Sequence, residues 1–233
     1  MFSTQTVRLA AGIVILFATL QGTAAALGST RGEWGLLVAA LVIAAAFAVQ
    51  RLLHGEGLGA IGVRVERRGL FVAVVLSGAI LAAGVTYAVI AGAQVSLYPN
   101  ATWLALGIMC QAGITEELIF RGYLYGRLAR TRPFWRAAMV SMWPFALVHM
   151  MLFVTLDWPL AMASLLLSIA LSFPLAHLYE LGVRTIWAPA VVHAVIQAGP
   201  KLVITDDAAF PLIWMICSLA IAWSSFLVRA QKT

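Results

Sequence analysis

Long apolar stretches separated by short polar segments make up most of this chain. A helix needs about 20 apolar residues to cross the hydrocarbon core of a bilayer. Candidate spans cover approximately residues 9–27, 34–53, 70–92, 102–128, 134–155, 158–179, 186–198 and 210–228. The seventh is short and flanked by Pro189 and Pro200, so we expect a half-helix or an earlier start. The pattern predicts an all-α, polytopic membrane bundle of about eight transmembrane helices.

The composition supports a membrane protein without a soluble domain. Of the 233 residues, 63% are hydrophobic and 10% are charged, whereas soluble domains carry about 25% charged residues. We therefore interpret residues 1–233 as one membrane domain. Cys110 and Cys217 lie inside apolar stretches, and we interpret them as small core residues rather than a disulfide or a metal pair.

The basic residues indicate the orientation of the spans. If the eight spans alternate in direction, twelve of the fifteen basic residues fall on one side, and Arg31 and Lys201 fall on the other. The twelve are Arg8, Arg51, Arg64, Arg67, Arg68, Arg127, Arg130, Arg132, Arg136, Arg184, Arg229 and Lys232. The positive-inside rule then places both termini in the cytoplasm. Topology therefore explains the net charge of +6 better than binding to nucleic acid does.

The first apolar stretch also has features of a signal peptide. Arg8 precedes it, and three alanines at 24–26 offer a cleavage site. We expect the stretch to be retained as a helix because it is long enough to cross the membrane.

A small set of polar and ionisable residues lies inside the predicted spans. Such residues cost several kcal/mol in a bilayer and normally face the bundle interior or a water-filled cavity. They are Glu116, Glu117 and Arg121 in the fourth span, His149 in the fifth, and His193 and Gln197 in the seventh.

Helical spacing sorts these residues into roles. Glu117 and Arg121 are four residues apart, so they share a helix face and can form an ion pair. Glu116 is turned by about 100° from Glu117 and can face another neighbour. His193 and Gln197 are also four apart and can line one side of a cavity.

This combination suits the activation of water. A desolvated carboxylate such as Glu116 becomes a better base near neutral pH, and the imidazole of His149 can orient the water and move its proton. His193 and the amide of Gln197 can stabilise an oxyanion. Neither the nucleophile pattern G-x-S-x-G nor the zinc pattern H-E-x-x-H occurs in the chain.

Three segments resemble the CPBP family, which comprises type II CAAX prenyl proteases and bacterial bacteriocin-processing or immunity (Abi) proteins. The family pattern is E-E-x-x-x-R, then F-x-x-x-H, then H-x-x-x-N. The chain has the first at Glu116–Arg121 and the second at Phe145–His149. The third runs from His193 to Gln197, with Gln where the family usually has Asn. The resemblance covers roughly residues 100–200, which would form the CPBP-like catalytic core.

The resemblance implies an intramembrane endopeptidase. Glu116 and His149 would activate water, and His193 and Gln197 would form the oxyanion site. Glu117 and Arg121 would hold the cavity together, and Phe145 would pack against it. We expect no cofactor, because an amide is a poor zinc ligand. If zinc is used, Glu116, His149 and His193 would ligate it.

The expected substrate is a lipidated, membrane-inserted or amphipathic peptide or protein. Short loops without an organelle signal suggest a bacterial inner membrane, which would make prenylated CAAX proteins unlikely substrates. Two alternatives remain open. One is a non-catalytic scaffold or bacteriocin-immunity protein on the same fold, which the departure at Gln197 supports. The other is a small proton-linked transporter, because intramembrane Glu and His also mark proton paths.

Overall fold

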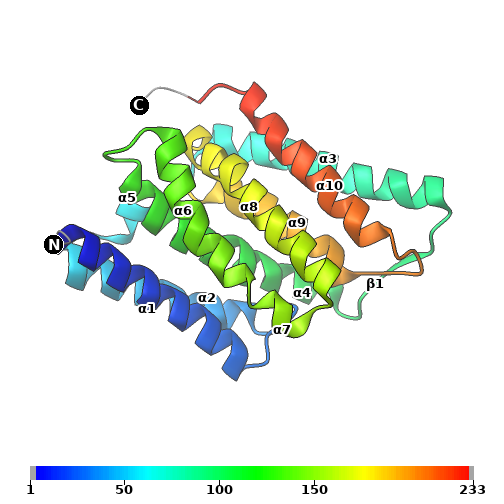
Figure 1. Cartoon of the computed structure of the whole chain (residues 1–233), viewed down its shortest axis with the longest axis horizontal. Coiled ribbons are helices and arrows are strands. Elements are labelled where there is room, and N and C mark those ends of the chain that lie inside the picture. The colour runs from blue at the N-terminus through cyan, green and yellow to red at the C-terminus, as the bar shows by residue number, and fades with distance from the viewer. Residues whose placement is uncertain (1–3, 231–233) are drawn as a thin grey trace.

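The computed structural model describes residues 4–230, which form an all-α bundle (Figure 1). Its helices, with η for π- and 3₁₀-helices, are α1 (Thr4–Ala26), α2 (Gly35–Val49), η1 (Gln50–His54), η2 (Leu58–Ile61), α3 (Arg67–Ala91), α4 (Ala101–Ile108), η3 (Met109–Glu116), η4 (Leu118–Tyr125), α5 (Gly126–Leu128), α6 (Phe134–His149), α7 (Leu152–Thr155), α8 (Trp158–Leu181), α9 (Trp187–Leu202), α10 (Phe210–Trp223) and η5 (Ser224–Leu227). The predicted fold class is therefore confirmed.

The predicted spans correspond to helices of the structure. Within the described residues, seven continuous helical segments are long and apolar enough to cross a membrane. The exception is α9, which has 16 residues and corresponds to the short seventh span. Its two prolines do not flank it as expected. Pro189 lies in its first turn, where a backbone N–H would have no helical partner, and Pro200 lies near its end.

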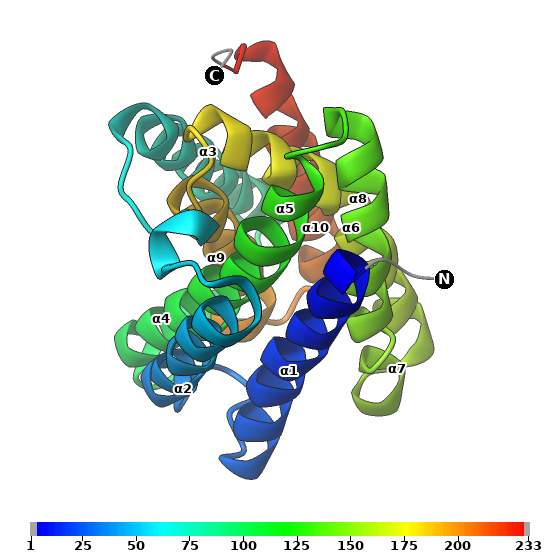
Figure 2. The same ribbon diagram turned by 90° about the vertical axis from the view of Figure 1, so that its left-hand side faces the viewer.

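The ends of the helices agree with an even number of crossings. In Figure 1 most helices slant from upper left to lower right; α1 begins and α5 lies at the left, and α10 runs up to the top of the view, so all three mark the upper-left end of the bundle. Figure 2 looks onto this end and shows α5 near the centre, with the other helices around it. The segment carrying Arg127, Arg130, Arg132 and Arg136 lies here. That this end faces the cytoplasm stays a prediction.

The continuous helix from α4 through η3, η4 and α5 lies in the interior of the bundle. Of an 18-residue apolar stretch within residues 101–128, 56% of the residues are buried, whereas the corresponding share in α1 is 17%. The short helix α9 packs against η3 on one side and against α3 and α8 on others. Glutamate-bearing η3 and histidine-bearing α9 are thus direct neighbours.

Two short strands close the other end of the bundle, and the apolar pattern did not predict them. Strand β1 (Val95–Leu97) pairs antiparallel with β2 (Val203–Thr205), with Ser96 opposite Ile204. The pairing ties the connection after α3 to the end of α9. Because β2 follows α9 directly, it fixes where α9 stops.

Glycines allow a close approach between α4 and the start of α2. A Cβ atom built on Gly107 would overlap the backbone carbonyl of Gly32, and one on Gly35 would overlap the carbonyl of Gly107. Small residues at helix interfaces let membrane helices pack backbone to backbone. A residue larger than glycine at Gly35 or Gly107 would therefore require the backbone to shift.

We expect Gly107→Ala to destabilise the protein by about 1–3 kcal/mol, because the added methyl group forces two backbones apart. The measurement is the melting temperature of purified protein in detergent. Gly78→Ala on α3 is the matched control, since nothing lies within 4 Å of a Cβ atom there. Equal melting temperatures for the two variants would show that the interface is not tightly packed.

Candidate active site

The helix that carries the glutamates is widened at the site. Residues Met109–Glu116 and Leu118–Tyr125 are π-helical, with Glu117 between the two segments. The sequence analysis assumed a regular α-helix here. π-Turns are rare and occur often at functional sites. The unusual backbone therefore coincides with the residues that the sequence singled out.

Glu117 is the centre of a buried polar network. Its Oε1 atom accepts a hydrogen bond from Arg121 Nη1 at 2.9 Å and one from His193 Nδ1 at 2.7 Å. All three side chains are buried, and that of Glu117 has no exposed area. The predicted pair with Arg121 is present. The bond to His193 was not predicted, because it depends on how α9 packs against the central helix.

The network fixes the orientation of the His193 ring. Because its Nδ1 atom donates to Glu117, the other ring nitrogen, Nε2, is turned toward Glu116, with 3.9 Å between Nε2 and Glu116 Oε2. This distance exceeds that of a hydrogen bond. A carboxylate behind an imidazole sets its tautomer and its orientation.

Glu116 differs from Glu117 because it takes no part in this hydrogen-bond network. Its side chain is 18% exposed and accepts no hydrogen bond from the described residues, whereas Glu117 has no exposed area and accepts two at Oε1. The Oε2 atoms of both glutamates are buried without a hydrogen-bond partner among the described residues. A buried carboxylate oxygen without a partner is costly, and functional sites are a common reason for keeping one. Glu116 is thus the acidic group of this pair that solvent or substrate can reach.

Phe145 brings the second histidine to the site. Its ring centroid lies 4.6 Å from that of His149 and 6.0 Å from that of His193, and the Arg121 guanidinium lies over the same ring at 4.3 Å. The His149 Nδ1 atom donates to the backbone carbonyl of Phe145 at 2.7 Å. His149 therefore has Nε2 available as an acceptor, within electrostatic range of Glu116.

The structure does not give Gln197 a defined partner. It lies one turn after His193 on α9, half-buried, and makes no described hydrogen bond. Lys201, one turn further, was expected in a loop, yet it lies in the last turn of α9. Its spacing of eight residues from His193 is the signal that would have placed it on the same face.

The residues as they lie do not fit a zinc site. Among residues 4–230, no three His, Cys, Asp or Glu side chains are close enough together to hold a metal ion. Glu116 and His193 are near each other, but the Nδ1 atom of His193 and that of His149 are already donating hydrogen bonds. The expectation that the protein needs no metal stays a prediction.

Comparison with known families gives one match over this part of the chain. Residues 98–199 match the family model described as type II CAAX prenyl endopeptidase Rce1-like. This segment of the chain is similar to that family. The match contains every residue of the predicted site, and it confirms the resemblance to CPBP and CAAX proteases. Neither a curated protein nor a solved structure matches the chain.

The Rce1-like match gives the general kind of function. The family is a family of proteases, so the match supports a peptidase with a membrane-associated peptide substrate. The seven apolar helices and the Rce1-like segment together make the chain a multi-pass integral membrane protein.

The two adjacent glutamates should respond differently to loss of charge. Glu117→Gln leaves Arg121 buried without its anion, so we expect a loss of about 3–5 kcal/mol in stability. Glu116→Gln breaks no described hydrogen bond and should change stability little. Melting temperatures in detergent check this, and a larger loss in Glu116→Gln would contradict the assignment of Glu117 as the structural member.

Proposed function

We propose that this chain is an intramembrane endopeptidase of the glutamic type, with Glu116 as the general base. One observation carries the proposal. Of two adjacent glutamates, Glu117 is fully buried and accepts hydrogen bonds from Arg121 and His193 at Oε1, whereas Glu116 is 18% exposed beside the same histidine and accepts no hydrogen bond from the described residues. An ion pair with Arg121 requires only one of the two carboxylates. The second carboxylate inside the membrane bundle is therefore a candidate for a catalytic role.

In the proposed reaction, Glu116 takes a proton from water while the water oxygen attacks the carbonyl carbon of the scissile peptide bond. The Nε2 atom of His149 accepts a hydrogen bond from the other O–H of the water, which keeps its hydrogen, and so orients the attack. Collapse of the tetrahedral intermediate breaks the C–N bond, and Glu116 returns its proton to the amine leaving group. One carboxyl group thus acts first as base and then as acid.

The carbonyl oxygen becomes an oxyanion that needs donors. We assign this role to His193 Nε2 and the amide of Gln197. Nε2 can donate only when the imidazole is protonated, since Nδ1 already carries the proton bonded to Glu117. The hydrogen bond to Glu117 holds the ring with Nε2 turned toward the site, which gives the buried network a role in the chemistry as well as in folding.

The burial of the site limits the substrate. Because His193 and Glu117 have almost no exposed area, the substrate must bring its peptide bond into the bundle. We propose a membrane-inserted, lipidated or amphipathic peptide or protein, in a bacterial inner membrane. A peptide precursor or membrane regulator then fits better than a prenylated CAAX protein.

The first experiment compares peptide termini in membranes that carry wild-type protein or Glu116→Gln at matched expression. We expect new termini that depend on Glu116, and a loss of about 10²–10⁴ in cleavage rate in the variant. Asp157→Asn is the matched control, since it removes an exposed carboxylate with no described partner.

Identical termini in wild type and variant would contradict a protease and favour the non-catalytic scaffold. If the termini are identical but proton uptake depends on Glu116, the transporter is favoured instead. A zinc chelator applied to the wild type should leave cleavage unchanged. Loss of cleavage with the chelator, restored by zinc, would overturn the metal-free mechanism while keeping the protease.

Gln197 is tested separately because it departs from the family pattern. We expect Gln197→Ala to lower kcat by about 10²–10³ with little change in KM or melting temperature, since the amide would act in the transition state and makes no described contact in the resting protein. Unchanged kcat would mean that His193 supplies the oxyanion site without Gln197.

A further inference from the structure

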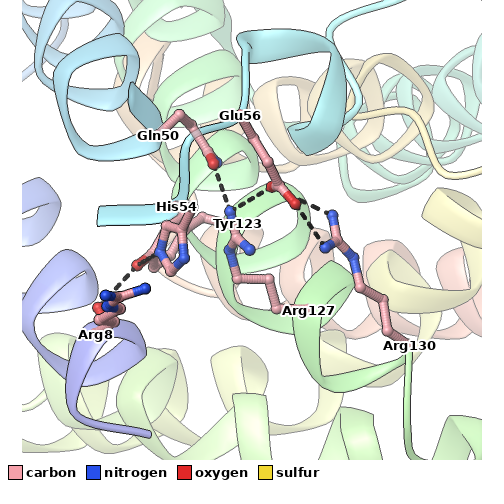
Figure 3. Close-up of polar contacts among 7 residues, drawn as sticks. All are labelled: Arg8, Gln50, His54, Glu56, Tyr123, Arg127 and Arg130. Carbon is pink, nitrogen blue, oxygen red and sulfur yellow. Dashed lines mark hydrogen bonds and ion pairs between the residues drawn. The ribbon is translucent and has the colours of Figure 1, made fainter. Parts of the chain in front are cut away.

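The arginines near the end of the central helix fall into two groups. Arg127 donates to Glu56 at 2.8 Å and also to Gln50, and Arg130 donates to Glu56 at 2.9 Å, as Figure 3 shows. These contacts hold the loop after η1 against α5. The charges of Arg127 and Arg130 are therefore used inside the protein.

Arg132 and Arg136 have no such partner. Both are exposed, and neither forms an ion pair or hydrogen bond with any residue in the range 4–230. They line one cavity of about 340 Å³, together with Thr131, Pro133, Met139 and Val140. We call this cavity the α6 groove. Its lining contains two cations and no acidic residue.

The groove continues into an apolar face of α6. Met139 is 51% exposed, Val140 42%, Trp143 62% and Leu147 60%. Met139, Trp143 and Leu147 recur every four residues, so they follow one face of the helix. With a rise of about 1.5 Å per residue, this face extends about 12 Å from Met139 into the region that the bilayer surrounds.

We propose that the α6 groove binds an anionic phospholipid. The headgroup phosphate lies between the guanidinium groups of Arg132 and Arg136, and one acyl chain follows Met139 and Val140 toward Trp143. Guanidinium groups bind phosphate through paired, charge-assisted hydrogen bonds, and basic pockets beside transmembrane helices hold anionic headgroups. The inference does not depend on the proposed peptidase activity.

The apolar wall favours a lipid over a soluble anion or an acidic peptide. A soluble phosphate would use the two arginines but leave Met139 and Val140 without a partner. An acidic peptide would place polar backbone against the same wall, at a cost for each unpaired group. A phospholipid matches both halves of the groove.

The test uses the full-length protein, purified in detergent and stripped of lipid. Phosphatidylglycerol and phosphatidylcholine with identical acyl chains are then added back. Native mass spectrometry measures how much of each lipid the protein retains. We expect the wild type to prefer the anionic lipid by about tenfold, and Arg132→Gln/Arg136→Gln to bring the ratio close to one. Each single variant should lose part of the preference.

Arg51→Gln/Arg67→Gln is the matched control. It removes two exposed charges from the same end of the bundle but outside the groove, so it should keep the preference. Three results would overturn the proposal: no preference in the wild type, an unchanged preference in the groove variant, or complete displacement of the lipid by millimolar inorganic phosphate or by an acidic hexapeptide. Equal melting temperatures of the two double variants exclude misfolding.

Discussion

A carboxylate inside a membrane bundle must have its charge compensated, and Glu117 obtains this compensation from two directions. Arg121 approaches from the next turn of the same helix, and His193 approaches from α9. Arg121 in turn lies over the ring of Phe145 on α6. Three helices are thus held in one register by a single carboxylate oxygen. Gly113 makes the register possible, because a Cβ atom there would lie 2.7 Å from the carbonyl of Ala190.

The adjacent glutamates divide two requirements that one residue cannot meet. A carboxylate that stabilises the bundle must accept hydrogen bonds and ion pairs from its neighbours. A carboxylate that takes a proton from water must be reachable by that water. Glu117 is fully buried and accepts two hydrogen bonds at Oε1, whereas Glu116 is partly exposed and accepts none from the described residues. The two glutamates follow one another where two π-helical segments meet, and their carboxylates lie beside different nitrogens of the His193 ring.

The features of this structure that depend on local pattern could be predicted from the sequence. The spans follow from hydrophobic length, and the pairing of Glu117 with Arg121 follows from a spacing of four. Contacts between helices could not be predicted from local pattern. The hydrogen bond from His193 to Glu117 depends on how α9 packs against η3. The strand pair depends on where the connected helices end, and the position of Lys201 depends on where α9 stops. Hydrophobic pattern carries no information on π-turns, because it records which residues are apolar and not how the backbone is hydrogen-bonded.

The departure at Gln197 has a consequence for where catalytic power would come from. His193 is oriented by a short bond to a buried carboxylate, so as a donor it would be preorganised. Gln197 has one more rotatable bond than the Asn of the family pattern and no described contact that fixes it. Ordering such a side chain in the transition state costs entropy, and preorganised donors stabilise an oxyanion most. In the proposed mechanism His193 therefore supplies the larger share of oxyanion stabilisation, and the Glu117 network that orients it becomes more important than in a protein with Asn at this position.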